Sequence, residues 1–306
     1  MYHYVRQSAG MDEAGVRGLT VQQFEKQLDA FCQMMEPLDW LGFHHWLCGS
    51  RTAPERSFVL TFDDGLKDHW QHVIPALERR RLRGLFFVPG AVLDRPRMLS
   101  AHAVHLLLSR LGDATLLNEL LAVLPDREDG RSWMDLVDRY AAETTWHYEP
   151  PARAHLKYLL TMALPVDIRR DAVERVFEKQ WGSSRHWARQ WYLNWEEVRT
   201  MQSMGHTIGA HGYAHEPYTR LSHEERRADM SRVAQLLADR LGNESRPLSF
   251  PFGRFNDDTL EACREAGFEF AFTTERACVR TRCHNLSLPR VDAAEVGDVL
   301  QEAVCP

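Results

Sequence analysis

The chain has 306 residues, of which 44% are hydrophobic and 26% charged, and these proportions are typical of a globular protein with a sizeable core. A formal net charge of -6 and the absence of a long run of Lys and Arg give no support for nucleic-acid binding. The apolar stretches are too short for a membrane span, and residues 1–30 lack the pattern of a secretory signal, so the sequence predicts a cytoplasmic protein with no membrane span.

Six cysteines are scattered along the chain without a Cys-x-x-Cys pair. In a chain of this length, such a distribution is more typical of reduced thiols than of a disulfide framework. We therefore expect free thiols at Cys32, Cys48, Cys263, Cys278, Cys283 and Cys305.

The first part of the chain alternates predicted strands and helices. Apolar runs predict strands at 2–5, 57–62 and 85–88, and helical spacing of apolar residues predicts helices that begin at Thr20 and at about residue 67. This order is typical of parallel βα units.

The alternation stops at about residue 95, and the pattern is helical until about residue 191. Amphipathic segments are predicted at 133–142, 152–163 and 168–180. We interpret 95–191 as a helical insertion within a single domain that spans 1–306. The insertion is extra scaffold, a lid or substrate-recognition element, or a dimer contact, and the sequence does not specify the oligomer.

The alternation resumes at Asn194, which is the predicted N-cap of a helix that ends near Gly205. The remaining predicted elements are strands at 206–210, 248–250, 268–273 and 286–291, and helices at 223–241 and 257–266.

Two adjacent acids, Asp63 and Asp64, follow the predicted strand at 57–62. Side chains alternate along a strand, but Gly65 permits a bend at the strand end, so both carboxylates can face one cleft. Burial of one carboxylate beside another is costly unless a cation or a shared proton compensates. The pair therefore indicates a metal site.

Two histidines, His211 and His215, lie four residues apart. Gly209, Gly212 and Pro217 favour a loop at a strand end over a helix, and in either conformation the ring nitrogens can converge. One carboxylate and two imidazoles leave a coordination position open for water, as in catalytic zinc sites. A divalent ion would acidify that water, and the second carboxylate, left uncoordinated, would be the general base.

Three segments together resemble the polysaccharide deacetylase family (NodB homology, carbohydrate esterase family 4). They are TFDDG at 61–65, IGAHGYAH at 208–215 and SFPFG at 249–253, and the resemblance covers about 1–95 and 192–292. It implies an α/β chain that forms a distorted (β/α) barrel of the NodB type, with the site at the carboxyl ends of the strands. The implied reaction is the metal-dependent removal of acetyl from an N-acetylated sugar.

The resemblance assigns roles to the acids and histidines. Asp63 is the expected base, and Asp64, His211 and His215 are the expected ligands of one divalent metal. Zinc is the default because the ligand set suits it, although cobalt, nickel and iron accept the same donors.

The third segment is expected to contribute backbone. The N–H of Phe252, together with the metal, would hold the oxyanion of the tetrahedral intermediate. Phe252 stands where the family usually has Tyr, a change of little consequence because the donor is main chain. Pro251 and Gly253 are expected to line the substrate site.

The chain departs from the family pattern at three points. Gly212 stands where a Ser or Thr hydroxyl usually steadies the histidine loop. Ser249 stands where an Arg often orients the base, and Arg290 is either its replacement or a plain surface salt bridge. Many members also supply a general-acid His near the C-terminus, but the corresponding region at 286–288 has none. Asp63 would then return the proton to the amine, or His3 would supply it.

The leading functional prediction is a carbohydrate N-deacetylase that acts on a glycan precursor or a surface-polysaccharide intermediate. A second prediction keeps the site but changes the substrate, as in an O-deacetylase, a deformylase or another small-amide hydrolase. A third, from another class, is a non-catalytic carbohydrate-binding protein.

Overall fold

The computed structural model describes residues 1–7, 16, 18–52, 54–126, 132, 133, 135, 153, 156, 159, 160, 164–242, 246–280 and 283–297. The chain forms two compact units. The first comprises Met1–Ala9, Arg17–Pro96 and Arg189–Pro306, and the second comprises Gly10–Val16 and Arg97–Ala188.

A five-stranded parallel sheet forms the centre of the first unit. Its strands follow chain order, and short apolar runs bury them on both faces, as is typical of parallel sheets covered by helices. The strands are β5 (Leu60–Phe62), β6 (Gly84–Val88), β7 (Thr207–Ala210), β8 (Leu248–Ser249) and β9 (Ala271–Phe272).

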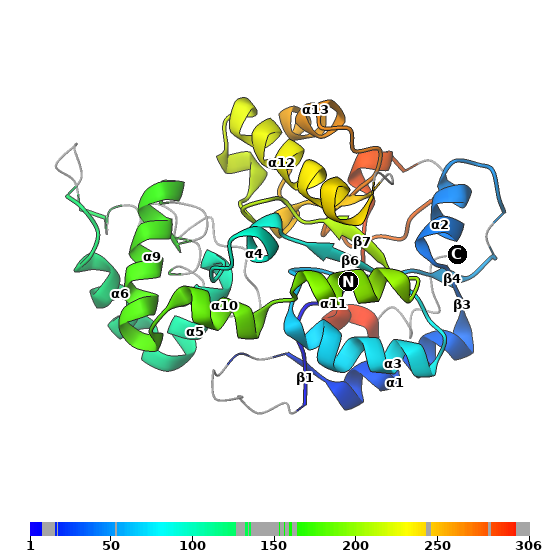
Figure 1. Cartoon of the computed structure of the whole chain (residues 1–306), viewed down its shortest axis with the longest axis horizontal. Coiled ribbons are helices and arrows are strands. Elements are labelled where there is room, and N and C mark those ends of the chain that lie inside the picture. The colour runs from blue at the N-terminus through cyan, green and yellow to red at the C-terminus, as the bar shows by residue number, and fades with distance from the viewer. Residues whose placement is uncertain are drawn as a thin grey trace. The chain divides into compact units, whose positions relative to one another are not determined.

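Helices of the first unit cover this sheet. In Figure 1, α3 (Ile74–Arg79) and α11 (Trp195–Ser203) lie on one side of β6 and β7, and α12 (His223–Leu241) and α13 (Asp257–Glu265) lie on the other. The first unit also contains α1 (Val21–Met34), α2 (Trp40–Leu47) and α4 (Gly90–Asp94), and the two-stranded sheets β1 (Val5–Arg6) with β2 (Leu19–Thr20) and β3 (Glu36–Pro37) with β4 (Ser57–Phe58).

The two edges of the five-stranded sheet are joined through short segments. Tyr2 forms a parallel bridge with Phe62 of β5, and Leu288 forms a parallel bridge with Phe272 of β9. Backbone hydrogen bonds then connect these segments to each other, from Met1 N to Val291 O at 2.7 Å and from Ala293 N to Met1 O at 2.9 Å. The strands therefore follow one another around a distorted barrel, as predicted.

Aromatic rings of β5 and β6 pack on the face of the sheet that α1 covers. The Phe62 ring stacks on Phe86 with centroids 4.6 Å apart and on Tyr2 with centroids 5.3 Å apart. All three side chains are buried. This packing fixes the strand that precedes Asp63 and Asp64.

Two side chains expected to cap helices do so, since Thr20 begins α1 and Asn194 begins α11, each in a reciprocal capping box with the residue three positions later. Ser222, which was not predicted as a cap, begins α12 in the same way. The helix predicted from residue 67 starts instead with a π-helical turn, η1 (His69–Val73), before α3.

The described part of the second unit is helical. It contains α5 (Ser100–Leu111), α6 (Asp113–Leu121), α9 (Val166–Trp181) and the larger part of α10 (Ser184–Trp191). The apolar faces of α5 and α9 are buried in this unit. The helices predicted at 133–142 and 152–163 lie largely outside the described residues.

Three expectations need correction. Pairing at 268–273 is limited to β9, because only Ala271 and Phe272 pair with β8. Residues 286–291 are not a strand: Asn285–Ser287 form a 3-10 turn, and Leu288 makes a single bridge. Cys278 is disulfide-bonded rather than reduced, whereas Cys32, Cys48, Cys263 and Cys283 are free thiols.

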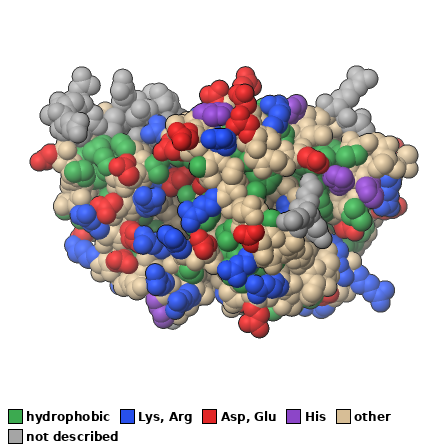
Figure 2. Space-filling view, turned by 45° about the horizontal axis from the view of Figure 1, so that its top comes forward, with side chains coloured by type: hydrophobic (Ala, Val, Ile, Leu, Met, Phe, Trp, Pro, Cys, Tyr) green, Lys and Arg blue, Asp and Glu red, His purple; other side chains and the backbone are tan. Residues whose placement is uncertain are grey.

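None of the described helices is long and apolar enough to cross a lipid bilayer. On the face shown in Figure 2, Lys and Arg side chains are interspersed with Asp and Glu.

Candidate active site

The site lies at the carboxyl ends of β5, β7 and β8, strands of the five-stranded sheet. Asp63 and Asp64 follow β5, His211 follows β7, and the segment Pro251–Gly253 follows β8. Because parallel strands end at the same edge of the barrel, segments far apart in the sequence meet there.

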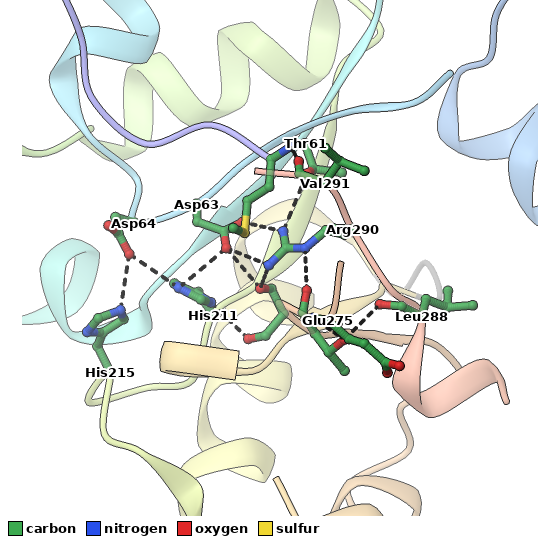
Figure 3. A network of polar contacts seen from close by, with 12 residues as sticks. Thr61, Asp63, Asp64, His211, His215, Glu275, Leu288, Arg290 and Val291 are labelled. Atoms are coloured by element: carbon green, nitrogen blue, oxygen red, sulfur yellow. Dashed lines mark hydrogen bonds and ion pairs between the residues drawn. The ribbon is translucent and has the colours of Figure 1, made fainter. Parts of the chain in front are cut away.

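Three side chains converge as a candidate metal centre (Figure 3). Oδ1 of Asp64 lies 3.2 Å from Nε2 of His211 and 3.1 Å from Nε2 of His215, and the three candidate ligand atoms lie within 4.8 Å of one another. A tetrahedral zinc ion with bonds of about 2.1 Å has ligand atoms about 3.4 Å apart. The separations in this cluster therefore fit one small divalent ion.

The surroundings of His211 favour a cation. Its Nδ1 lies 2.8 Å from Ser249 O, and a proton on Nδ1 would leave Nε2 as the ligand atom. Burial by itself would lower the pKa of His211, but the Asp63 and Asp64 carboxylates outweigh burial and raise it. The same negative field would attract a metal ion.

Asp63 is held separately from the three candidate ligands. Arg290 donates to both of its oxygens, from Nη1 to Oδ1 and from Nη2 to Oδ2, each at 2.8 Å. Ser249 Oγ donates to Oδ2 at 3.1 Å, and His211 Nε2 lies 4.0 Å from Oδ2. Burial would raise the pKa of Asp63, but Arg290 and His211 lower it by more, so Asp63 is ionised.

Arg290 is a buried residue with partners on several strands. Its Nε donates to Thr273 O at 2.8 Å and its Nη2 to Ser249 Oγ at 2.8 Å, while Nη1 lies 3.4 Å from Thr61 Oγ1. The geometry thus places Arg290 against Asp63, and the alternative of a plain surface salt bridge is wrong.

The backbone of the site is unusual at three positions. Asp64, His215 and Phe252 have positive φ values of 76°, 57° and 58°. Residues other than glycine rarely adopt this conformation, and it persists only where the surrounding structure enforces it. All three belong to the segments that carry the predicted site.

The segment after β8 lies next to the candidate ligands. The Phe252 ring is 5.0 Å from the His215 ring, measured between centroids, which places the Phe252 side chain beside the cluster. The oxyanion role of the Phe252 N–H stays a prediction. Pro251 is buried, and a Cβ on Gly253 would overlap Thr274 Oγ1. Gly253 therefore has a steric role, and the substrate-lining role of Pro251 and Gly253 stays a prediction.

His3 lies close enough to Asp63 for its charge to lower the pKa of that carboxyl. Its backbone is fixed by a buried imidazole, because His69 Nε2 lies 2.9 Å from His3 O. Burial lowers the pKa of His69 to about 4. His69 is thus neutral near pH 7, and its ring packs against Phe62 and Phe86.

Ser249 is a site residue that the sequence reasoning missed. The sequence shows it only as a departure from the family's Arg, yet its hydroxyl contacts Asp63 and Arg290 and its carbonyl contacts His211. The available signal was its position at the end of β8, two residues before the segment Pro251–Gly253.

An acid beside a carboxylate–imidazole cluster at the carboxyl edge of a parallel barrel defines a hydrolase with a candidate metal centre. The family model described as Polysaccharide deacetylase matches residues 50–110 and 176–271, which is half of the chain, and the protein belongs to this family. It is accordingly a hydrolase of the deacetylase kind.

Solved structures of deacetylases share the fold. The chain matches the deacetylase PplD of Streptococcus pyogenes, solved with acetate, with a TM-score of 0.62 at 14% identity over 100% of this chain and 96% of that one. It matches IcaB of Ammonifex degensii with a TM-score of 0.59 at 16% identity over 99% and 96%. The NodB-type distorted barrel is thereby confirmed.

A sequence relative is YxkH of Bacillus subtilis (strain 168), whose name places it in the same family. The two chains are 26% identical over 84 residues. This match spans 28% of the present chain and 30% of YxkH, less than a third of either protein.

Proposed function

We propose that the protein is a metal-dependent deacetylase that removes the N-acetyl group from an N-acetylated sugar, in a glycan precursor or a surface-polysaccharide intermediate. The observation that supports this most is an ionised carboxylate, Asp63, held beside the Asp64, His211 and His215 cluster but outside it. A cation in that cluster would lower the pKa of water and polarise the acetyl carbonyl, and zinc is our first choice because of its preference for such donors.

The residues around the cluster would then divide the chemistry. Asp63 would accept a proton from the attacking water, and its strong pairing with Arg290 makes it a weak base, so an acidified water is needed. The N–H of Phe252 would donate to the oxyanion that forms on the acetyl carbonyl.

The leaving amine requires a proton, and the sequence offers two sources. Asp63 can return the proton it accepted, or His3, which lies near Asp63, can donate one. A His3→Ala variant with unchanged turnover would remove His3 from the scheme.

The proposal predicts that Asp63→Asn abolishes turnover but leaves metal binding intact. An isosteric amide cannot accept the water proton, and general-base catalysis contributes about 10²- to 10⁴-fold. The measurement is acetate release from N-acetylhexosamine compounds, with metal content determined on the same samples.

Chelation of the wild-type protein should abolish acetate release, and addition of Zn²⁺ should restore it. Activity that survives both chelation and Asp63→Asn would overturn the mechanism. A panel of N-acetyl, O-acetyl and N-formyl substrates, scored for acetate against formate, identifies the acyl group.

A further inference from the structure

A carboxylate from a neighbouring helix holds the loop between the two histidines. Asp229, on α12, accepts from the backbone N–H of Tyr213 through Oδ1 at 2.7 Å and from that of Ala214 through Oδ2 at 2.8 Å. These two amides lie between His211 and His215 in the sequence. One side chain thus fixes the peptide that separates the two candidate imidazole ligands.

The space beside Gly212 is filled by the same carboxylate and its partner. Gly212 has a φ of 67°, and a Cβ there would lie 2.9 Å from Tyr218 Oη and 3.1 Å from Asp229 Oδ1. Tyr218 is fully buried, and its Oη donates to Asp229 Oδ1 at 2.9 Å. Since Gly212 has no side chain, it makes no side-chain contact that would steady the loop.

Helix α4 holds the loop through other groups. Gly90 N donates to Gly212 O at 2.9 Å, and Ala91 N donates to Tyr213 O at 2.8 Å. Those contacts are all main chain, so substitution leaves them in place. The contacts to Asp229 are charge-assisted, and a side-chain change removes them selectively.

We propose that Asp229 is a positioning residue of the metal centre: it holds the histidine loop so that Nε2 of His211 and Nε2 of His215 both face Asp64. Substitution of a residue that holds metal ligands in place from outside the coordination sphere commonly weakens metal affinity 10- to 100-fold. This inference rests on the proposed metal-dependent function and extends it to a residue that touches neither metal nor substrate.

The test is the metal affinity of Asp229→Asn. The amide keeps the size of the side chain but presents an NH₂ to one of the two loop N–H groups, so one hydrogen bond is lost. Titration of the metal-free protein with Co²⁺, followed by its visible absorption, should give an affinity at least tenfold weaker than wild type. Turnover should recover at saturating metal, because Asp63 is unaffected.

Asp94→Asn is the matched control. Asp94 also contacts Tyr213, but its Oδ2 accepts from the phenol Oη at 2.6 Å rather than from the backbone. This variant also removes one negative charge but leaves the loop peptide held, so its Co²⁺ affinity should stay within about twofold of wild type, well below the 10- to 100-fold loss typical of outer partners.

Three outcomes overturn the inference. The first is wild-type affinity in a folded Asp229→Asn protein, and the second is an equal loss in Asp94→Asn. If Asp229→Asn does not fold, Asp229→Glu replaces it in the test, because it retains the charge and displaces the carboxylate by one methylene. Wild-type Co²⁺ affinity in Asp229→Glu is the third outcome that overturns the inference. A wild-type protein that binds no Co²⁺ overturns the proposed function as well, which distinguishes the two failures.

Discussion

At the scale of single residues, the Asp63–Arg290 pair combines catalysis with stability. Both side chains are buried, and two parallel hydrogen bonds of 2.8 Å join them. A buried carboxylate that loses its guanidinium is left unpaired, which costs about 3–5 kcal/mol. Arg290 is therefore expected to be among the positions least tolerant of substitution.

We predict that Arg290→Gln lowers the free energy of unfolding by about 3 kcal/mol and also lowers turnover. Urea denaturation measures the first effect, and acetate release per folded molecule measures the second. Arg80→Gln is the control, because Arg80 pairs with partly exposed Glu25 and Asp29. This substitution should lower the free energy of unfolding by less than about 1 kcal/mol. Equal costs for the two variants would contradict this prediction.

Residues that are close in sequence were the easiest to predict. Asp63 with Asp64, and His211 with His215, carry their own spacing signal, and the structure brings Asp64 together with both histidines. Arg290 lies 227 positions from Asp63, so no local pattern could distinguish it from a surface ion pair. Asp229 had no signal in the sequence and Ser249 had only its place at a strand end, because each acts through contacts that only the folded barrel creates.

At the scale of elements, the turn after β5 depends on close packing. Gly65 has a φ of 62°, and a Cβ there would lie 2.7 Å from Val88 Cγ1 at the end of β6. The turn that carries Asp63 and Asp64 can therefore approach β6 only without a side chain at this position.

We predict that Gly65→Ala costs about 2–4 kcal/mol, from the positive φ together with overpacking, and weakens metal binding. Gly49→Ala is the control, because Gly49 has a φ of 69° but its Cβ would meet nothing within 4 Å. That variant should cost only about 1 kcal/mol. Urea unfolding of both variants isolates the effect of the contact with Val88. If the two variants lose the same free energy of unfolding, the contact with Val88 is unimportant.

Helices were predicted better than strands because their signals are local. Predicted caps at Thr20 and Asn194 located α1 and α11 from residues a few positions apart, and α12 was predicted with its observed bounds. Strand pairing at 268–273 and 286–291 depends on distant partners, and there the predicted strands were too long or wrong. The π-helical turn at His69–Val73 follows the helical pattern of the sequence and has no separate signal.

At the scale of the whole molecule, two buried histidines make stability depend on pH. Burial lowers the pKa of His69 to about 4, and burial with the nearby charge of Arg83 lowers that of His206 to about 4. Each is neutral when folded, whereas in the unfolded chain each binds a proton below about pH 6.5. Stability is therefore complete above that pH and falls as the pH drops toward 4.

We predict that the free energy of unfolding falls by up to about 3 kcal/mol for each of these histidines between pH 6.5 and pH 4. His69→Gln keeps a donor for His3 O but does not titrate, so its stability should depend less steeply on pH than that of wild type. Urea unfolding at pH 7.5, 6, 5 and 4.5 gives the comparison. Parallel curves for the two proteins would contradict the assignment to His69.

The position of Arg290 has a consequence for how this protein can evolve. It lies in the segment that joins the two edges of the sheet, and it contacts residues on or next to β5, β8 and β9 in addition to the base. Natural selection for turnover and natural selection for a folded chain therefore act on one guanidinium. We therefore expect a substitution at Arg290 to persist only where another cation already pairs with the buried Asp63 carboxylate.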